Sequence, residues 1–271
     1  MKFEFRLLLS SSTNIRFPVG WVGWVVWLIL AILIILAAYH WKNYNRTRGK
    51  IQRLFFLILL LLTPVASLFF GFKVTQPFAQ APSAILAGAA EHWIMIFSGL
   101  PWILAGGLLG PTPAALIGLA SGIFSAFWGN HSAYLPLEIS LLAVLYSAAI
   151  NQRYRTNFYR LLRRPVFAAF CLALVYPILY LVSAPFTVPG APVIRLDYAI
   201  NNLAPAWIST SVVLILSGLA AELVSLFFPS IWGSKGRLLP SPAERSLQAR
   251  FIYSIAPIAF LLVVTLLAGS W

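Results

Sequence analysis

Apolar runs of about twenty residues recur along the whole chain, and short polar segments separate them. A helix needs about 20 mostly apolar residues to cross roughly 30 Å of hydrocarbon. Only 9% of the 271 residues are charged, whereas a soluble domain carries about 25%. The sequence therefore predicts an all-α protein, a polytopic bundle of transmembrane helices with the lipid bilayer as its main solvent.

Eight runs are long enough for a span once the apolar stretch from Ala84 to Phe127 is divided. The segment Gly110–Pro113 divides it, because prolines and glycine end one helix and start the next. The interval 84–100 could instead form a kinked long helix or a partial re-entrant segment. The predicted spans cover about 18–40, 54–72, the two halves of 84–127, 134–151, 165–184, 205–228 and 251–270.

Lysine and arginine are concentrated in three of the connections between these spans. They mark the cytoplasmic side, since they resist transfer out of the cytoplasm. The second and sixth connections hold only Lys73 and Arg195. With eight spans, this predicts a multi-pass membrane protein with both termini outside the cytoplasm. The basic connections contain Lys42, Arg46, Arg48, Lys50 and Arg53; Arg153, Arg155, Arg160, Arg163 and Arg164; and Lys235, Arg237, Arg245 and Arg250.

The predicted topology divides the chain into four parts. The segment Ser241–Glu244 fits a capping box, so a helix is expected to start there in the cytoplasm and lead into the last span. Lys2, Arg6 and Arg16 near the N-terminus oppose an outer location, and an odd number of spans is the alternative. The parts are an N-terminal arm (1–17), a membrane bundle of seven spans (18–228), a basic cytoplasmic loop with the juxtamembrane helix start (229–250) and the last transmembrane helix (251–271).

Small residues recur every four positions on both sides of the Gly-Pro segment. This spacing flattens one face of a helix and lets a neighbouring backbone approach closely. Tight packing without a ligand is one interpretation, and a compact helical hairpin that walls a pocket is the other. The predicted packing residues are Gly106, Gly110, Ala114, Gly118, Gly122 and Ala126.

Ionisable side chains within a span cost roughly 2.5 to 3.5 kcal/mol on insertion scales, so each is a candidate site. In the predicted topology several polar groups gather on the outer side. They could form a vestibule that holds a small extracytoplasmic ligand, or they could simply be solvated at the membrane surface. Arg195 and Asp197 are expected in the outer loop before the seventh span. The candidate ligand-binding residues are Glu91, His92, Asn130, His131 and Glu138.

Metal, nucleic-acid and catalytic chemistry find little support in the sequence. His40, His92 and His131 lie on different segments, and Cys171 is the only cysteine, so neither a metal site nor a cofactor is expected. The basic residues form no helix or sheet face suited to nucleic acid. Phosphate-binding, zinc-protease and nucleophile-elbow motifs are missing, and Ser121 only superficially matches a membrane serine protease. This chain is not expected to be an enzyme.

The segment from Pro101 to Asn130, PWILAGGLLGPTPAALIGLASGIFSAFWGN, contains two runs rich in small residues joined by a Gly-Pro turn. It resembles the glycine-rich hairpin of the LytS-type five-span sensor regions of bacterial signalling proteins. Substrate-binding subunits of vitamin transporters have a similar hairpin. LytS-type regions commonly carry an arginine after the second helix, where this chain has Phe127 and Trp128.

A second segment, Pro240 to Phe251 (PSPAERSLQARF), resembles the stretch that leads into the last membrane helix of large bacterial sensor proteins. Together the resemblances imply the sensory input region of a two-component, histidine-kinase-like protein, ending at Trp271 as an N-terminal fragment. Its partner would be an output domain or kinase, and a longer parent protein could carry a kinase or cyclase domain. The chain could also act as a homodimer. The alternatives are a transport component with a small-solute site and a membrane anchor without a ligand.

Overall fold

The computed structural model of the chain describes residues 15–45, 49–68, 71–74, 92–128, 132–233 and 238–240, together with residues 255 and 258. Most of them are helical, which confirms the prediction of a mostly helical protein. The described helices are α1 (Gly20–His40), α2 (Lys50–Leu68), α4 (Leu100–Leu108), α5 (Pro111–Trp128), α6 (Leu135–Asn151), α7 (Asn157–Leu162), α8 (Pro165–Ser183) and α9 (Pro192–Phe227). The other described elements are the short 3-10 helices η2 (Lys42–Tyr44) and η3 (Ala184–Thr187) and the strands β1 (Gly71–Val74) and β2 (His92–Met95).

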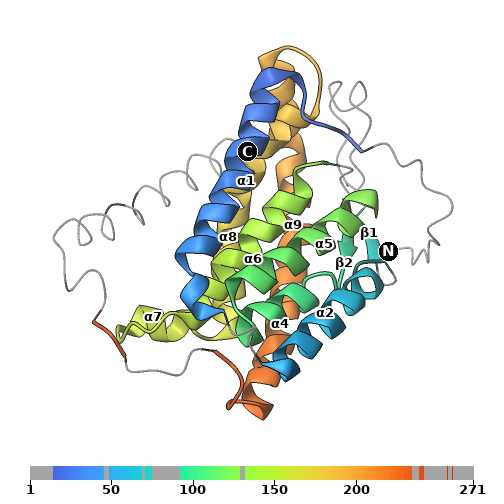
Figure 1. Cartoon of the computed structure of the whole chain (residues 1–271). Coiled ribbons are helices and arrows are strands. Elements are labelled where there is room, and N and C mark those ends of the chain that lie inside the picture. Colours follow the sequence, from blue (N-terminus) through green and yellow to red (C-terminus); the bar gives the residue numbers. More distant parts are fainter. Residues whose placement is uncertain are drawn as a thin grey trace.

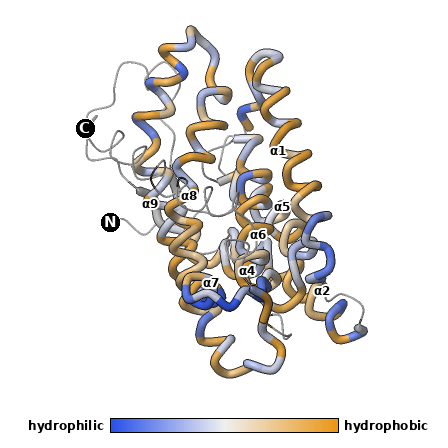
Figure 2. Tube along the Cα trace, turned by 90° about the vertical axis from the view of Figure 1, so that its left-hand side faces the viewer, coloured by the Kyte–Doolittle hydropathy of each residue, from blue (hydrophilic) through white to orange (hydrophobic). Residues whose placement is uncertain are grey.

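Four of the described helices are long and apolar enough to cross a membrane, namely α1, α2, α9 and α8 continued by η3. Much of their surface faces away from the protein. Leu28, Ile32 and Ile35 of α1, for example, are each more than half exposed. Figure 2 shows apolar residues along most of α1, α8 and α9. Because soluble monomers rarely expose apolar patches larger than a few hundred Å², these helices indicate a membrane protein.

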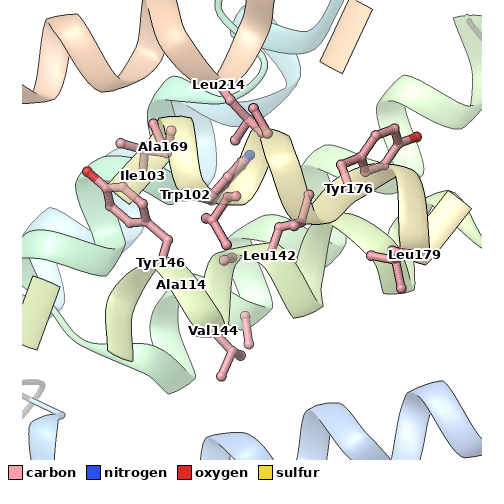
Figure 3. Packing of buried hydrophobic residues seen from close by; sticks show 14 of the residues in the cluster. Trp102, Ile103, Ala114, Leu142, Val144, Tyr146, Ala169, Tyr176, Leu179 and Leu214 are labelled. Atoms are coloured by element: carbon pink, nitrogen blue, oxygen red, sulfur yellow. The ribbon is translucent and has the colours of Figure 1, made fainter. Parts of the chain in front are cut away.

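The helices α5 and α6 form an antiparallel hairpin in the middle of the bundle. They have 18 and 17 residues and lie between α1 on one side and α2 on the other (Figure 1). Most residues of α6 are buried, because it packs against α1, α4, α5 and α8. The apolar core therefore centres on α6, and Figure 3 shows its Leu142 and Tyr146 among side chains of the neighbouring helices.

The described parts of the predicted basic connections lie together at one end of the bundle. Asn45, which follows η2, exchanges two hydrogen bonds with Thr112 (2.8 and 3.1 Å) and so caps the first turn of α5. The Gly233 amide donates to the last turn of α4 (3.0 Å), and the Leu239 amide donates to the Arg153 carbonyl (2.8 Å). We call this the basic end; α7 and the end of α9 lie there, at the bottom of Figure 1.

Another set of contacts closes the opposite end, which we call the distal end. The Ala133 amide donates to the Arg16 carbonyl (3.0 Å), and the Val19 amide donates to the Phe186 carbonyl (2.8 Å). These bonds join the segment before α1 to the α5–α6 connection and to η3. The turn from α8 into α9 lies at the same end, at the top of Figure 1. The described α5–α6 and α8–α9 connections thus lie at the end opposite to the basic end.

The third apolar run differs from its prediction as a spanning helix. Its described part begins with β2, which pairs antiparallel with β1, Val74 opposite His92 and Gly71 opposite Met95. Turns follow, and α4 begins only at Leu100 and has nine residues. The reason is local: Pro101 favours a helix start, and a glycine with positive φ follows at Gly110. A single helix through residues 92–109 is therefore wrong, and residues 84–91 lie outside the described part.

Helix α9 begins earlier than the predicted seventh span. Arg195 and Asp197 lie in its first turns, so their expected location in a loop is wrong. Pro192 takes the first helical position, where its missing N–H costs nothing, and Pro205 is accommodated inside the helix. Its 36 residues give a length of about 54 Å at 1.5 Å per residue. The predicted juxtamembrane helix and eighth span fall almost entirely outside the described residues.

Candidate functional site: a buried carboxyl between two cavities

Glu138 is the one predicted ligand-binding residue whose side chain the structure describes, and it is buried, with only 3% of its surface exposed. It lies in the first turn of α6, where Pro136 helps to start the helix. Tyr134 and Leu142, four residues to either side, are also buried. Because residues four apart share a face of a helix, the fold of α6 carries Glu138 into the interior with its apolar neighbours.

Hydroxyl groups of α8 satisfy the Glu138 carboxyl. The Tyr176 hydroxyl donates to Oε2 over 3.3 Å, and the Ser183 hydroxyl donates to Oε1. These two residues are seven apart, which is two helical turns, so α8 presents both to the same neighbour. Thr210 of α9 is a further hydrogen-bond partner of Tyr176. Neutral hydroxyl groups thereby connect the carboxyl of α6 to two other helices, α8 and α9.

A cavity of about 20 Å³ adjoins the carboxyl where α8 ends and η3 begins. This volume holds about one water molecule. We call it the small cavity. The lining residues are Ser132, Leu135, Glu138, Tyr180, Ser183, Ala184, Thr187 and Tyr198.

A second cavity, of about 70 Å³, lies among β2, α4, α5, α6, α8 and α9; we call it the large cavity. Apolar side chains form part of its wall, and Figure 3 shows three of them, Trp102, Leu142 and Leu214, in the interior of the bundle. Tyr176 also lines this cavity while its hydroxyl contacts Glu138. The polar part of the wall consists of Ser98, Ser125, Tyr176, Ser209 and Thr210.

The hydroxyls of the large cavity differ in how they are satisfied. Ser98 donates to the Met95 carbonyl and Ser209 to the Ala206 carbonyl, over 2.8 and 2.9 Å. The Ser125 Oγ is buried, and the described residues offer it no hydrogen-bond partner. An unpaired buried hydroxyl on a cavity wall is a position where a bound molecule gains a hydrogen bond. The large cavity can therefore bind a small molecule with both apolar and polar parts.

Arg16 reaches the distal side of this site from the segment before α1. Its Nη1 donates to the Tyr198 hydroxyl over 2.9 Å, and its guanidinium carbon lies 5.9 Å from the centre of the Tyr198 ring. Tyr198 in turn lines the small cavity. The N-terminal arm therefore contributes to the site, which sequence reasoning missed because a contact between residues 182 positions apart leaves no local pattern.

The other predicted vestibule residues are not brought to this site by the described part of the chain. Glu91, Asn130 and His131 lie outside the described residues. Of His92 only the backbone is described, paired with Val74 across the β1–β2 ladder. The hydroxyl partners of Glu138 were missed, although their signal was present: Tyr176, Tyr180, Ser183 and Thr187 repeat at three or four residue intervals along one apolar run.

The small residues of α5 face α6. A Cβ at Gly118 would lie 2.9 Å from the Cβ of Ala143, and a Cβ at Gly122 would lie 2.4 Å from the Cα of Pro136. Ala114 is fully buried and Ala126 is 2% exposed. This close approach sets the position at which α6 starts, and therefore the position of Glu138.

The remaining small residues have different surroundings. Gly106 of α4 faces α6, where an added Cβ would lie 2.9 Å from Cδ1 of Tyr146. Gly110 was expected on the same helical face, but it lies in the turn between α4 and α5 with a φ of 107°. Ser121 donates to the Ser98 carbonyl over 2.8 Å and is fully buried. It therefore links α5 to the turn that precedes α4.

Histidine, cysteine, aspartate and glutamate do not gather in groups of three suitable for a metal ion within the described residues. The conspicuous chemistry there is a single carboxyl surrounded by hydroxyls. Comparisons with protein-family models, with curated proteins and with solved structures found no match to this chain.

Proposed function

We propose that the chain is the membrane-embedded input region of a bacterial signal-transduction protein and that the large cavity holds its ligand. The observation that carries the proposal is the shared wall of this cavity, to which α4, α5, α6, α8 and α9 all contribute. A ligand there would touch Thr210 and Val213 in the middle of α9, which connects the distal end with the basic end. When a ligand binds one of two helix arrangements more tightly, it shifts the equilibrium between them.

We further propose an inner-membrane topology of eight crossings, the third made by β2, the turns after it and α4 instead of one helix, with both termini outside the cytoplasm. The described parts of the basic connections lie at one end of the bundle, and lysine and arginine favour the cytoplasmic side. The distal end, with Arg16 and Glu138, would then face the outside and admit an extracytoplasmic ligand. The partners in this proposal are the bilayer, that ligand, an output domain or kinase, and a second copy of the chain.

Filling the large cavity is expected to change signalling output. A Ser125→Leu substitution places an apolar side chain in the space of a ligand and removes a hydroxyl that has no described partner. We expect kinase activity to change about fivefold or more, the usual scale of coupling between two sites. The assay is autophosphorylation of a chimera in which the full chain is extended by one transmembrane helix and a heterologous histidine kinase.

The matched control for this experiment is Ser225→Leu. Ser225 also lies on a membrane helix, but its hydroxyl donates to the Glu222 carbonyl over 2.8 Å and it does not line the cavity. The control chimera should keep wild-type activity. Equal activity of wild type, Ser125→Leu and Ser225→Leu would contradict the signalling proposal.

A transport component is the second candidate function. It is favoured by the small cavity beside Glu138, where α8 continues into η3, because transporters bind solutes and coupling ions between membrane helices. Uptake of amino acids or vitamins by cells that express the chain, without any change in kinase output, would favour transport. If substitutions in the large cavity were silent in both assays, the chain would be a ligand-free anchor.

A further inference from the structure

We propose that the small cavity beside Glu138 binds a monovalent alkali cation, for which Na⁺ is the test ion. The side-chain polar atoms of its described lining residues are all oxygens, supplied by one carboxyl and by serine, threonine and tyrosine hydroxyls. Hard cations such as alkali and alkaline-earth ions prefer oxygen ligands. The inference goes beyond the proposed function, because it does not depend on which ligand enters the large cavity.

Charge balance favours a monovalent ion over a divalent one. Among the described residues, Glu138 is the single carboxylate in the wall of the small cavity. A buried charge has to be paired or to coordinate an ion, since leaving water is costly. One monovalent cation neutralises this carboxylate, whereas a divalent ion would add an excess positive charge close to the Arg16 guanidinium, which bonds to Tyr198 in the cavity wall.

The volume of the small cavity matches a single dehydrated ion. About 20 Å³ of space holds one body of the size of a water molecule. An organic ammonium ion with several carbon atoms is too large for this space. The large cavity, at about 70 Å³, is the place for such ligands, so the two cavities can select different partners.

The hydroxyl groups around the carboxyl can turn their protons away from an ion. Ser183 Oγ has two acceptors, Oε1 of Glu138 and the Tyr180 carbonyl at 3.1 Å. If its proton goes to the carbonyl, an oxygen lone pair faces the cavity. Thr187 already donates to the Ala184 carbonyl over 2.8 Å and is also a hydrogen-bond partner of Tyr198, which still leaves a lone pair of its oxygen for an ion. Both residues can therefore coordinate a cation together with the carboxylate.

The end of α8 adds a favourable electrostatic field. The helix stops at Ser183, and η3 follows directly, so the C-terminal carbonyls of α8 lie beside the cavity. The C-terminus of a helix carries a partial negative charge that favours cations. The carboxylate, the hydroxyl oxygens and the end of α8 thus all favour a cation in the small cavity.

A cation in the small cavity would also affect the large cavity, through the side chain of Tyr176. This side chain lines the large cavity and donates its hydroxyl to Glu138. A cation that binds the carboxylate competes for the same oxygen atoms and reorients the tyrosine hydroxyl. This last step rests on the proposed function, in which the large cavity holds the signalling ligand.

The test measures thermal unfolding of the purified full chain in lipid nanodiscs at slightly alkaline pH. NaCl is exchanged for N-methyl-D-glucamine chloride at constant ionic strength, so only the small cation varies. We expect saturating NaCl to raise the unfolding midpoint by about 5 °C, because a ligand that binds only the folded state stabilises it. An identical midpoint in both salts would overturn the proposal.

Two variants and one matched control locate the effect. Glu138→Gln keeps the shape of the side chain but removes its charge and should abolish the response to NaCl. Ser183→Ala keeps the carboxylate and should shift the response to higher NaCl; it also serves if the glutamine variant does not fold. Glu222→Gln changes the glutamate that accepts from the Val166 amide and should respond as wild type. A wild-type response in Glu138→Gln and Ser183→Ala would overturn the proposal, and neither result involves the kinase readout.

Discussion

Replacing Gly122 with alanine is expected to destabilise the protein by about 2 kcal/mol, although alanine is the better helix former. In an exposed helix the change would stabilise by about 1 kcal/mol. Here the new Cβ would lie 2.4 Å from the Cα of Pro136 and 3.0 Å from the Leu135 carbonyl oxygen. Both atoms belong to the backbone and cannot rotate away, so the cost of overpacking is at the upper end of its usual range of about 1–3 kcal/mol. The net effect therefore has the opposite sign to the helix propensity.

The measurement is a denaturant titration of the folded fraction in detergent micelles. The control is Gly49→Ala, because a Cβ there would meet only the flexible Gln52 side chain, at 3.0 Å, and should change stability by a few tenths of a kcal/mol. A stability of Gly122→Ala equal to or above that of wild type would show that α5 and α6 do not approach as closely as described.

Much of the helical arrangement could be predicted from the sequence because apolar runs of membrane length have few alternatives. The run predicted at 165–184 corresponds to α8, and the fifth span corresponds to α6 within one residue at its start. Hydropathy fails to predict the structure where an apolar segment does not form a helix, or where a polar segment does. Residues 92–95 are apolar enough for a span, yet they form β2, and pairing with β1 supplies their backbone hydrogen bonds. The beginning of α9 was missed for the opposite reason, since Arg195 and Asp197 lower hydropathy without ending a helix.

The candidate site was predictable in part. A glutamate among apolar residues marks Glu138, and a polar stripe at helical spacing marks Tyr176 and Ser183 on α8. The local sequence pattern does not contain the rotation of α8 about its own axis. This rotation decides whether the polar stripe of Tyr176 and Ser183 faces lipid or faces α6. The same holds for Arg16, whose contact with Tyr198 depends on how the segment before α1 folds back on the distal end. Individual polar residues can be recognised from the sequence, but their convergence is a property of packing.

The burial of Glu138 decides between the two interpretations of this outer polar group. Interfacial solvation was one reading of the predicted vestibule, and it does not describe Glu138, whose side chain is only 3% exposed. A carboxyl with two hydroxyl donors and an adjoining cavity is placed by the fold, because α6 and α8 must be in register for both bonds to form. Polar groups inside a membrane are costly and usually functional. Glu138 is therefore the residue on which tests of function should concentrate.

Gly110→Ala is expected to be the second strongly destabilising substitution, at about 3 kcal/mol. The glycine has a φ of 107°, and a conformation with positive φ costs an L-residue roughly 1–2 kcal/mol. In addition, a Cβ would lie 2.6 Å from the Tyr44 carbonyl oxygen and 2.8 Å from the Cα of Asn45. These atoms belong to the segment that caps α5 through Asn45 and Thr112. The substitution therefore strains the turn and also loosens the cap.

Gly190→Ala separates these two contributions, since Gly190 has a φ of 134° but its nearest neighbour would lie 3.6 Å from an added Cβ. It should cost only the backbone strain, about 1–2 kcal/mol, in the same denaturant titration. The excess loss in Gly110→Ala then measures the contact between the first basic connection and the start of α5. If both variants lost the same stability, strain alone would account for Gly110, and the close approach of Tyr44 and Asn45 would be wrong. A larger loss in Gly110→Ala would instead mean that contacts across the α4–α5 turn fix the basic end. The same contacts set the register of α5 against α6, and this register determines the position of Glu138.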